Sequence, residues 1–590
     1  MLSHDLNPNQ LEAVKYGNGP LLITAGAGSG KTKTLTNRLA HLLSQGIPGK
    51  QIVAITFTNK AAEEMKRRTF AMLARPLSDT NVPVDTNNLP FIGTFHAFGA
   101  KILRHESSAY GRTGSFTIFD ENDAIKIVKK ILKEGDFDKI KYPFGSVRRS
   151  ISRAKDELSN DFTDEQIGYI YDRYEIELQK HNAFDFSDLI EKPTRLFLSS
   201  PEKLFNYQSY FRYFLVDEYQ DINVAEYQLI KLLSSKEKNI SVVGDDHQSI
   251  YSFRSADLRN FLNFERDFPG AKVIVLDQNY RSTKNIITAS AAVINNNKYQ
   301  RPKTLWTQNR EGEPVKVYGF TSAEEEADWL AQNISDTGHT AILYRTNAQS
   351  RPIEQSLVFH SVPYFIYGGL KFYDRKEIKD IISALRYAVN PADELSKERM
   401  LKEFKKTRVR PIIDSLPDIA TNLSPVEFIG YLLKETNYTD SLRSDRNFED
   451  RMENIGELIT FASSFQTVAE LVERVSLLES TDQPKTGRVS TSQTNTPLRL
   501  MTIHMAKGLE FESVFLAGAS ESILPHSRSI FKAESVEEER RLMYVAMTRA
   551  KKELSISFFK NASRFLYEIP PDLVMFNNSK QKNSDTIYLD

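Results

Sequence analysis

Residues 20–32 read Pro-Leu-Leu-Ile-Thr-Ala-Gly-Ala-Gly-Ser-Gly-Lys-Thr, an apolar run followed at once by a glycine-rich turn. The apolar run predicts a buried strand, and the residues after the turn predict a helix. Such a turn lets successive backbone N–H groups face an anion, while Lys31 adds an ammonium group and Thr32 a hydroxyl. We therefore predict a loop that binds the phosphates of a nucleoside triphosphate. The residues expected around those phosphates are Ala25, Gly26, Ala27, Gly28, Ser29, Gly30, Lys31 and Thr32.

Ala25 occupies the place where the generic pattern begins with glycine. It ends the predicted strand, where φ stays negative, so we expect the exchange to do little harm. The alternative interpretation is a strand-to-helix turn that binds no ligand. The combination of strand, glycines and Gly-Lys-Thr favours nucleotide binding.

Short apolar runs alternate with helical patterns along most of the chain, which predicts α/β layers with parallel sheets. The predicted strands are 20–25, 52–57, 213–216, 240–243, 273–276, 341–344, 498–503, 513–516 and 554–557. Two long helical stretches interrupt this alternation. We therefore predict two α/β domains, each of which carries a mostly helical insertion.

The predicted boundaries follow those interruptions. The first domain covers 1–110 and 185–275, with its insertion at 111–184, and the second covers 276–375 and 490–570, with its insertion at 376–489. Gly368-Gly369, near the start of the second insertion, is a candidate hinge because glycine absorbs large φ/ψ changes. Residues 571–590 are polar and are expected to form a disordered tail.

Composition excludes several classes of protein. The 590 residues are 40% hydrophobic and 26% charged, which is ordinary for a globular protein with several cores. Lys+Arg and Asp+Glu both number 77, so a site for a polyanion must be a local patch. There is no cysteine, which excludes disulfides and cysteine-ligated metals. The start of the chain does not resemble a signal peptide, and no apolar run approaches the ~20 residues that span a bilayer, so we expect a cytoplasmic enzyme.

A pair of carboxylates follows the predicted strand 213–216. Asp217 is suited to hold Mg²⁺, and Glu218 is suited to take a proton from the water that attacks a γ-phosphate. An Asp-Glu pair after an apolar run is usually only the end of a strand that meets solvent. Because the pair follows a phosphate loop in the same predicted domain, the catalytic interpretation is favoured. A base that activates water indicates an NTPase rather than a kinase.

Further motifs occur in a fixed order along residues 6–570. They are Leu6-Asn-Pro-Asn-Gln10, Thr56-Phe-Thr-Asn-Lys-Ala-Ala62, Gly93-Thr-Phe-His-Ala-Phe98, Val243-Gly-Asp-Asp-His-Gln-Ser-Ile-Tyr-Ser-Phe-Arg254, Gln278-Asn-Tyr-Arg-Ser-Thr283, Thr502-Ile-His-Met-Ala-Lys-Gly-Leu-Glu-Phe511 and Glu538-Glu-Arg-Arg-Leu-Met-Tyr-Val-Ala-Met-Thr-Arg-Ala550. Together with the phosphate loop and the Asp217-Glu218 strand, they closely resemble the UvrD/Rep/PcrA family of superfamily 1 DNA helicases.

The resemblance implies two RecA-like P-loop domains and a 3′→5′ motor on single-stranded DNA that uses ATP and Mg²⁺. In the ATP site it assigns Gln10 to the adenine edge, Tyr280 to stacking on the base and Glu510 to the ribose. The resemblance also implies that Lys31 and Thr32 hold phosphate and Mg²⁺ and that Arg38 contributes to nucleotide binding. It implies that Gln248 links the γ-phosphate to DNA. Arg281 and Arg549 are expected to reach the γ-phosphate from the second domain.

The same resemblance assigns the DNA contacts to Phe57, His96, Tyr251, Phe253 and Arg254. Aromatic faces stack on any base, which gives grip without sequence preference. Phe253 replaces the family's more usual Trp, and Ser255 replaces a usual Gly. For Phe57 the alternative is packing in the core at a strand end.

The expected partners are single-stranded DNA and duplex with a 3′ tail, bound by a monomer or weak dimer that serves repair or replication. Two alternatives stay open. One is an ATPase that walks along single strands and displaces proteins without efficient unwinding, because the second insertion is shorter than in familiar members. The other is a nucleotide-gated DNA-binding scaffold that scarcely turns over ATP.

Overall fold

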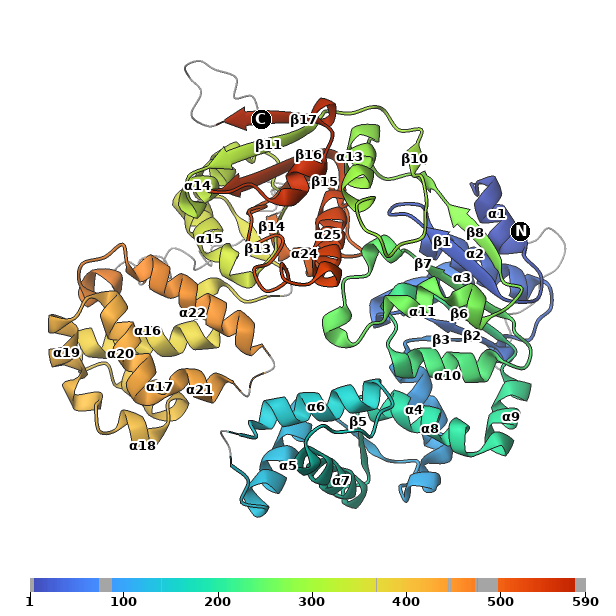
Figure 1. Ribbon diagram of the computed structural model, residues 1–590, viewed down its shortest axis with the longest axis horizontal. Coiled ribbons are helices and arrows are strands. Elements are labelled where there is room, and N and C mark those ends of the chain that lie inside the picture. Colours follow the sequence, from blue (N-terminus) through green and yellow to red (C-terminus); the bar gives the residue numbers. More distant parts are fainter. Residues whose placement is uncertain are drawn as a thin grey trace. The chain divides into compact units, whose positions relative to one another are not determined.

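The computed structural model describes residues 5–73, 88–138, 141–367, 369–443, 445, 447–472, 475 and 497–578. The chain divides into two compact units (Figure 1). The first comprises Met1–Arg281 and Asn297–Asn309, and the second comprises Ser282–Asn296 and Arg310–Asp590. Across the described ranges, no helix has the length and apolar character needed to span a membrane.

The first unit is built on a six-stranded parallel sheet with the order β3-β2-β6-β7-β1-β8. Its strands are β1 (Leu21–Ala25), β2 (Ile52–Ile55), β3 (Phe91–Gly93), β6 (Tyr213–Val216), β7 (Ile240–Gly244) and β8 (Lys272–Leu276). The helices are α1 (Pro8–Lys15), α2 (Lys31–Ser44), α3 (Asn59–Leu73), α4 (Phe95–Glu106), α8 (Asp188–Ser199), α9 (Pro201–Tyr210), α10 (Val224–Ser234), α11 (Leu258–Leu262) and α12 (Phe264–Asp267). Because β1 lies next to β7, and β7 next to β6, the loops after these three strands share one edge of the sheet.

Both faces of this sheet are buried, as the continuous apolar strands predict. Successive residues point to opposite faces, so Leu21 and Ile23 join one core with Leu35 of α2. Leu22 joins the other core with Phe98 of α4. The two cores hold β1 rigidly in the middle of the sheet, and β1 leads directly into the phosphate loop.

The first insertion forms a separate group of helices in the first unit (Figure 1). It consists of α5 (Glu121–Glu134), α6 (Phe144–Asp156) and α7 (Glu165–Lys180), closed by the parallel pair β4 (Thr117–Phe119) and β5 (Ala183–Asp185). Its core contains an ionic cluster in which the buried ammonium of Lys155 lies 3.0 Å from Asp185 and 2.6 Å from Asp188. Burying charges in this way is tolerated because each charge has partners.

The second unit has a seven-stranded parallel sheet with the order β13-β14-β12-β15-β16-β11-β17. The strands are β11 (Val315–Phe320), β12 (Thr340–Tyr344), β13 (Tyr364–Ile366), β14 (Leu498–Thr502), β15 (Phe511–Leu516), β16 (Ala550–Phe559) and β17 (Val574–Asn578). Its helices include α13 (Lys284–Ile294), α14 (Ala323–Asn333), α15 (Ser350–Phe359), α24 (Ile503–Ala506) and α25 (Ala533–Met547). The two α/β sheets confirm the predicted fold class.

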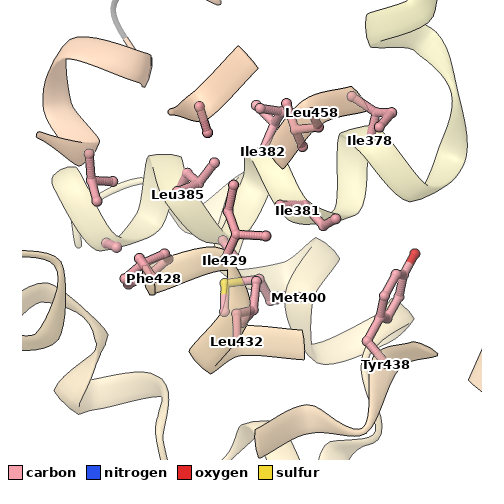
Figure 2. Packing of buried hydrophobic residues seen from close by; sticks show 14 of the residues in the cluster. Ile378, Ile381, Ile382, Leu385, Met400, Phe428, Ile429, Leu432, Tyr438 and Leu458 are labelled. Atoms are coloured by element: carbon pink, nitrogen blue, oxygen red, sulfur yellow. The ribbon is translucent and has the colours of Figure 1, made fainter. Parts of the chain in front are cut away.

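The second insertion has an apolar core of its own (Figure 2). Its helices are α16 (Lys376–Val389), α17 (Glu394–Glu403), α18 (Lys406–Val409), α19 (Leu416–Asn422), α20 (Pro425–Thr436), α21 (Tyr438–Leu442) and α22 (Phe448–Ala462). In α16, Ile378, Ile381, Ile382 and Leu385 recur at helical spacing, so they line one face of the helix. Figure 2 shows Ile381 and Leu385 on the side of Ile429 of α20, and Ile382 beside Leu458 of α22, in one cluster of buried residues.

The division between the units differs from the boundary expected at residue 276. β8 pairs with β1, and the N–H of Tyr280 donates to the carbonyl of Gly28 at 3.0 Å, so the first unit continues to Arg281. Arg281, expected on the second domain, therefore belongs to the first unit. Residues 297–309 return to the first unit, where the short strand β10 (Trp306–Thr307) pairs with β9 (Gln278–Asn279).

The expectation of a disordered tail from residue 571 is wrong for its first part. Val574–Asn578 form β17, which pairs in parallel with β11 at the edge of the second sheet. Val574, Met575 and Phe576 are good strand formers, and their preference outweighs the polar residues that follow. Residues 579–590 and the candidate hinge residue Gly368 lie outside the described residues.

Candidate nucleotide site and DNA interface

The phosphate loop lies between β1 and α2, as predicted. Gly28 and Gly30 have φ values of +66° and +83°, which are in the left-handed region that favours glycine. A Cβ on Gly28 would lie 2.7 Å from Nδ2 of Asn279, so this position also lacks room for a side chain. Ala25 is the last residue of β1 and is buried, consistent with the mild effect expected of its replacing glycine.

Thr32, in the first turn of α2, meets the acidic strand end. Its hydroxyl donates to Oδ2 of Asp217 at 3.0 Å. Burial, reinforced by the charge of Glu218, raises the pKa of Asp217 to about 7. The two oxygens expected to hold Mg²⁺ are therefore brought together by elements 185 residues apart in the sequence.

Glu218 follows Asp217 with φ at +53°, a left-handed conformation for a residue that is not glycine. Such conformations cost about 1–3 kcal/mol and persist where the surroundings enforce them. One carboxylate oxygen of Glu218 accepts from Nε2 of Gln220 at 2.6 Å. The Glu218 carboxylate is thus held by a hydrogen bond from Gln220, two residues further along the chain.

The loop after β7 contributes a third group of charges. Nζ of Lys31 lies 3.8 Å from Oδ2 of Asp245, and the same oxygen accepts from Nε2 of Gln248 at 2.5 Å. The buried ammonium of Lys303 lies 2.6 Å from Asp245 and 2.5 Å from Asp246. Although burial alone would raise it, these ammonium groups bring the pKa of Asp245 below its ordinary value.

Near the expected base-binding side, Gln10 is buried and forms both halves of a capping box with Asn7. Its Nε2 donates to the carbonyl of Ser29 at 2.9 Å, which joins α1 to the phosphate loop. The hydroxyl of Tyr280 lies 2.9 Å from Nδ2 of Asn7, and the Tyr280 side chain is 48% exposed. Gln10 and an accessible aromatic ring are therefore linked through Asn7, in the arrangement expected for an adenine site.

Arg38 does not have the role expected of it. It is 2% exposed, and its guanidinium donates to Oγ of Ser241 at 2.8 Å. It also donates to backbone carbonyls between residues 13 and 17. Burial lowers the pKa of Arg38 to about 10. Because these groups bind the guanidinium, Arg38 anchors the segment after α1, and these contacts do not support the expected contribution of Arg38 to nucleotide binding.

Arg281 follows Tyr280 beside the phosphate loop. Its N–H donates to Oδ1 of Asn279 at 2.8 Å, and Nδ2 of Asn279 donates to the carbonyl of Ala27 at 2.7 Å. The Cβ of Arg281 lies 2.8 Å from the place that a Cβ on Gly28 would occupy. Asn279 therefore holds Arg281 next to the expected phosphates from within the first unit.

An aromatic cluster on the first unit joins residues from two separate motifs. The rings of Phe57 and Tyr251 are stacked with centroids 5.3 Å apart, and Phe253 contacts Tyr251 edge-on at 5.8 Å. The guanidinium of Arg254 lies 5.6 Å from the centre of the Tyr251 ring. Phe57 is 37% exposed and Phe253 is 65% exposed, so the alternative of core packing for Phe57 is not supported.

His96, the remaining predicted DNA contact, stacks on Phe186 with centroids 3.9 Å apart. Burial lowers the pKa of His96 to about 4, so the imidazole is neutral near pH 7. Phe186 is 55% exposed. An accessible aromatic pair of this kind is suited to stacking on nucleotide bases.

In the second unit, Arg549 and Glu510 lie at the adjoining ends of β15 and β16, where the N–H of Phe511 donates to the carbonyl of Arg549 at 3.0 Å. The guanidinium of Arg549 is 1% exposed and donates to the carbonyls of Val545 and Leu509 at 3.0 and 3.2 Å. Glu510 pairs with Nζ of Lys551 at 2.9 Å. The second unit thus gathers its predicted nucleotide contacts at one edge of its sheet.

Sequence reasoning missed several residues that complete these sites: Asn7, Phe186, Gln220, Asn279 and Lys303. Asn7 and Asn279 lie inside the motifs Leu6–Gln10 and Gln278–Thr283, and Gln220 follows Glu218 by two residues, so a local signal marks all three. Lys303 lies 58 residues from Asp245 in a stretch without a motif, and only the fold brings the two together.

Known proteins resemble this chain over most of its length. Residues 6–269 match the UvrD/REP helicase N-terminal domain, and residues 274–426 and 426–561 match the UvrD-like helicase C-terminal domain. The ATP-dependent DNA helicase PcrA of Bacillus subtilis is 38% identical over an alignment 659 positions long, gaps included, which covers 98% of this chain and 88% of the relative. The PcrA proteins of Staphylococcus epidermidis and Staphylococcus aureus are each 36% identical, and the alignments cover 100% and 99% of this chain and 89% and 88% of those relatives. The chain therefore belongs to the UvrD/REP family and is a DNA helicase of the UvrD/Rep/PcrA type.

Proposed function

We propose that this helicase hydrolyses ATP at the phosphate loop of the first unit and uses the energy to move 3′→5′ along single-stranded DNA. The observation that carries the proposal is the meeting of Thr32 and Asp217 at 3.0 Å, with Glu218 as the next residue. It supports a site in which phosphate, metal-binding oxygens and a general base share one edge of the sheet.

ATP binding follows from the charges at that edge. The ammonium of Lys31 is compensated by Asp245 at 3.8 Å, a loose ion pair that a γ-phosphate can replace. The positive-φ glycines leave backbone N–H groups available to the β-phosphate. The exposed ring of Tyr280 supplies a stacking face for adenine, and Gln10 lies behind it.

The hard oxygen donors of Thr32 and Asp217 fit Mg²⁺, which prefers carboxylate, hydroxyl, water and phosphate oxygens. When bound, the ion supplies charge compensation between the β- and γ-phosphates. Glu218 orients the attacking water and accepts its proton. Arg281 and Arg549 stabilise the charge that develops on the γ-phosphoryl group, with Arg549 supplied by the second unit.

DNA binding is assigned to the aromatic cluster of Phe57, Tyr251 and Phe253 with Arg254, and to the pair His96 and Phe186. Stacking of this kind is worth about 1–3 kcal/mol per base and is tolerant of sequence. Gln248 lies three residues before Tyr251 and contacts Asp245, so the same loop joins the phosphate site to the DNA cluster. We propose that this loop couples nucleotide state to DNA grip, in a cytoplasmic enzyme that acts as a monomer or weak dimer.

The test is DNA-stimulated ATPase activity combined with unwinding of fluorescent duplexes that carry a 3′ or a 5′ tail. We expect strong stimulation by oligo-dT and unwinding of the 3′-tailed duplex only. Translocation without strand separation would favour the alternative motor that displaces proteins. Tight DNA binding with negligible turnover would favour the scaffold.

A further inference from the structure

Gln220 lies between the general base and the loop that contacts Lys31, and its side chain is fully buried. It belongs to a 3-10 turn, Tyr219–Asp221, directly after Glu218. Its Oε1 accepts the backbone N–H of Asp245 at 2.9 Å. Its Nε2 donates to Glu218 at 2.6 Å and to Asp221 at 2.9 Å.

This arrangement fixes the orientation of the amide. Carboxylates accept hydrogen bonds and a backbone N–H donates, so a reversed amide would place like groups against each other at all three contacts. Gly244 leaves the room that this amide occupies, because a Cβ there would lie 2.5 Å from Oε1 of Gln220. The amide thus has one well-defined position, and the carboxylate of Glu218 is held to it.

We propose that Gln220 is a positioning residue for ATP hydrolysis that holds Glu218 in its strained turn and ties it to the Asp245–Gln248 loop. The inference rests on the proposed role of Glu218 as general base. Glu218 has a left-handed backbone, so its carboxylate depends on its surroundings for its direction. Asp245 contacts Lys31, Gln248 and Lys303, so the link through Gln220 reaches the groups assigned to the γ-phosphate.

Two substitutions separate the contacts of the amide. Gln220→Leu removes both the donor and the acceptor, whereas Gln220→Glu keeps an acceptor for the N–H of Asp245 and removes donation to Glu218. We expect both to lower kcat of DNA-stimulated ATP hydrolysis by roughly 30- to 100-fold, the loss typical of a misplaced reacting group. We expect mant-ADP affinity and oligo-dT affinity to change by less than about twofold, because neither substitution touches the residues assigned to binding.

Gln208 provides the matched control. It is also a buried glutamine of the first unit, and its Nε2 donates to the carbonyl of Leu232 at 2.8 Å and to Oγ of Ser235 at 2.9 Å. Gln208→Leu removes a comparable pair of buried hydrogen bonds away from the site. It should lower the melting temperature and leave kcat within about twofold of the unsubstituted enzyme.

The decisive measurement repeats Gln220→Leu in a Glu218→Gln background, with single-turnover hydrolysis as the readout. If Gln220 acts through Glu218, Gln220→Leu lowers the hydrolysis rate of the Glu218→Gln enzyme by no more than about twofold. If Gln220 acts independently of Glu218, the substitution lowers that rate by the same factor as in the unsubstituted enzyme. A full additive loss, a kcat of Gln220→Leu and Gln220→Glu close to that of the unsubstituted enzyme, or failure of both variants to fold would overturn the inference. An unsubstituted enzyme without DNA-stimulated turnover would overturn the proposed function as well, which distinguishes the two failures.

Discussion

The two units hold their nucleotide-directed side chains by different means. In the first unit, Lys31 and Lys303 lie against the carboxylate of Asp245, and the neutral hydroxyl of Thr32 donates a hydrogen bond to Asp217. In the second unit, the guanidinium of Arg549 is bound by backbone carbonyls of Val545 and Leu509. Backbone carbonyls are neutral acceptors, whereas the carboxylate beside Lys31 is an anion that a bound phosphate would replace. We expect the residues at the first edge to contribute chiefly to binding and Arg549 at the second edge to stabilise charge that appears during the reaction.

Substitution at Arg549 tests the second half of this comparison, and we expect the largest effect there. Arg549→Lys keeps a positive charge but loses the planar fork that spans two acceptors. We expect a fall in kcat of about 10³–10⁵, as for arginine fingers in general, with little change in nucleotide affinity. Single-turnover hydrolysis at saturating oligo-dT measures the effect.

Arg540→Lys is the control, because this guanidinium lies on α25, which ends two residues before Arg549, and pairs with Glu568 at 2.7 Å. It should leave kcat nearly unchanged. If the kcat of Arg549→Lys approaches that of the control, Arg549 has no role in catalysis. The proposed difference in function between the two edges would then be wrong.

Glu218→Gln tests the first edge. The amide is isosteric but accepts no proton at neutral pH, so we expect ATP binding to persist while hydrolysis falls by about 10²–10⁴. Equilibrium binding of mant-ATP and steady-state turnover with oligo-dT give the two quantities. Substantial residual turnover would assign proton transfer to another group. Joint loss of binding and turnover would show that Glu218 supports the loop instead.

Lys303→Met tests whether the first edge depends on compensated buried charge. The substitution leaves Asp245 and Asp246 buried without the ammonium that lies within 2.6 Å of both. Removing one partner of a buried pair typically costs about 3–5 kcal/mol of unfolding free energy. Urea denaturation of the full chain measures the loss.

Lys272→Met is the matched control, since its ammonium pairs with Glu12 at 2.9 Å with both side chains about half exposed. An exposed pair of this kind contributes about 0–1 kcal/mol. Equal losses of unfolding free energy for the two lysine variants would mean that Lys303 stabilises the fold no more than a surface lysine does. The contrast between the two units would then have no support from stability.

Local sequence predicted the elements of both edges but not the contacts that join them. The strand-turn-helix at residues 20–44 and the Asp217-Glu218 strand end lie where expected, because apolar runs and glycine-lysine-threonine are local signals. Lys303 and the carbonyls that bind Arg38 are long-range partners, and no spacing along the chain indicates them. The same cause explains the boundary between the units. Pairing of β8 with β1 and of β9 with β10 keeps Arg281 with the first unit, which a composition shift does not reveal.

The smallest expected effect concerns the turn that carries the aromatic cluster of the first unit. Ser255 has φ at +62°, and a left-handed residue other than glycine costs about 1–2 kcal/mol. Ser255→Gly removes that cost. Glycine also gives the unfolded chain more freedom, which lowers stability by about 0.4–1 kcal/mol, so we expect a net stabilisation of about 0.5 kcal/mol. Ser252→Gly, in the 3-10 turn that spans Ser252–Arg254, has no such strain to release and should destabilise. Denaturation midpoints of the two variants, measured side by side, decide the sign. A loss of stability in Ser255→Gly equal to that in Ser252→Gly would mean that contacts of the Ser255 side chain outweigh the backbone strain. The positive φ of Ser255 would then cause no net loss of stability at this turn.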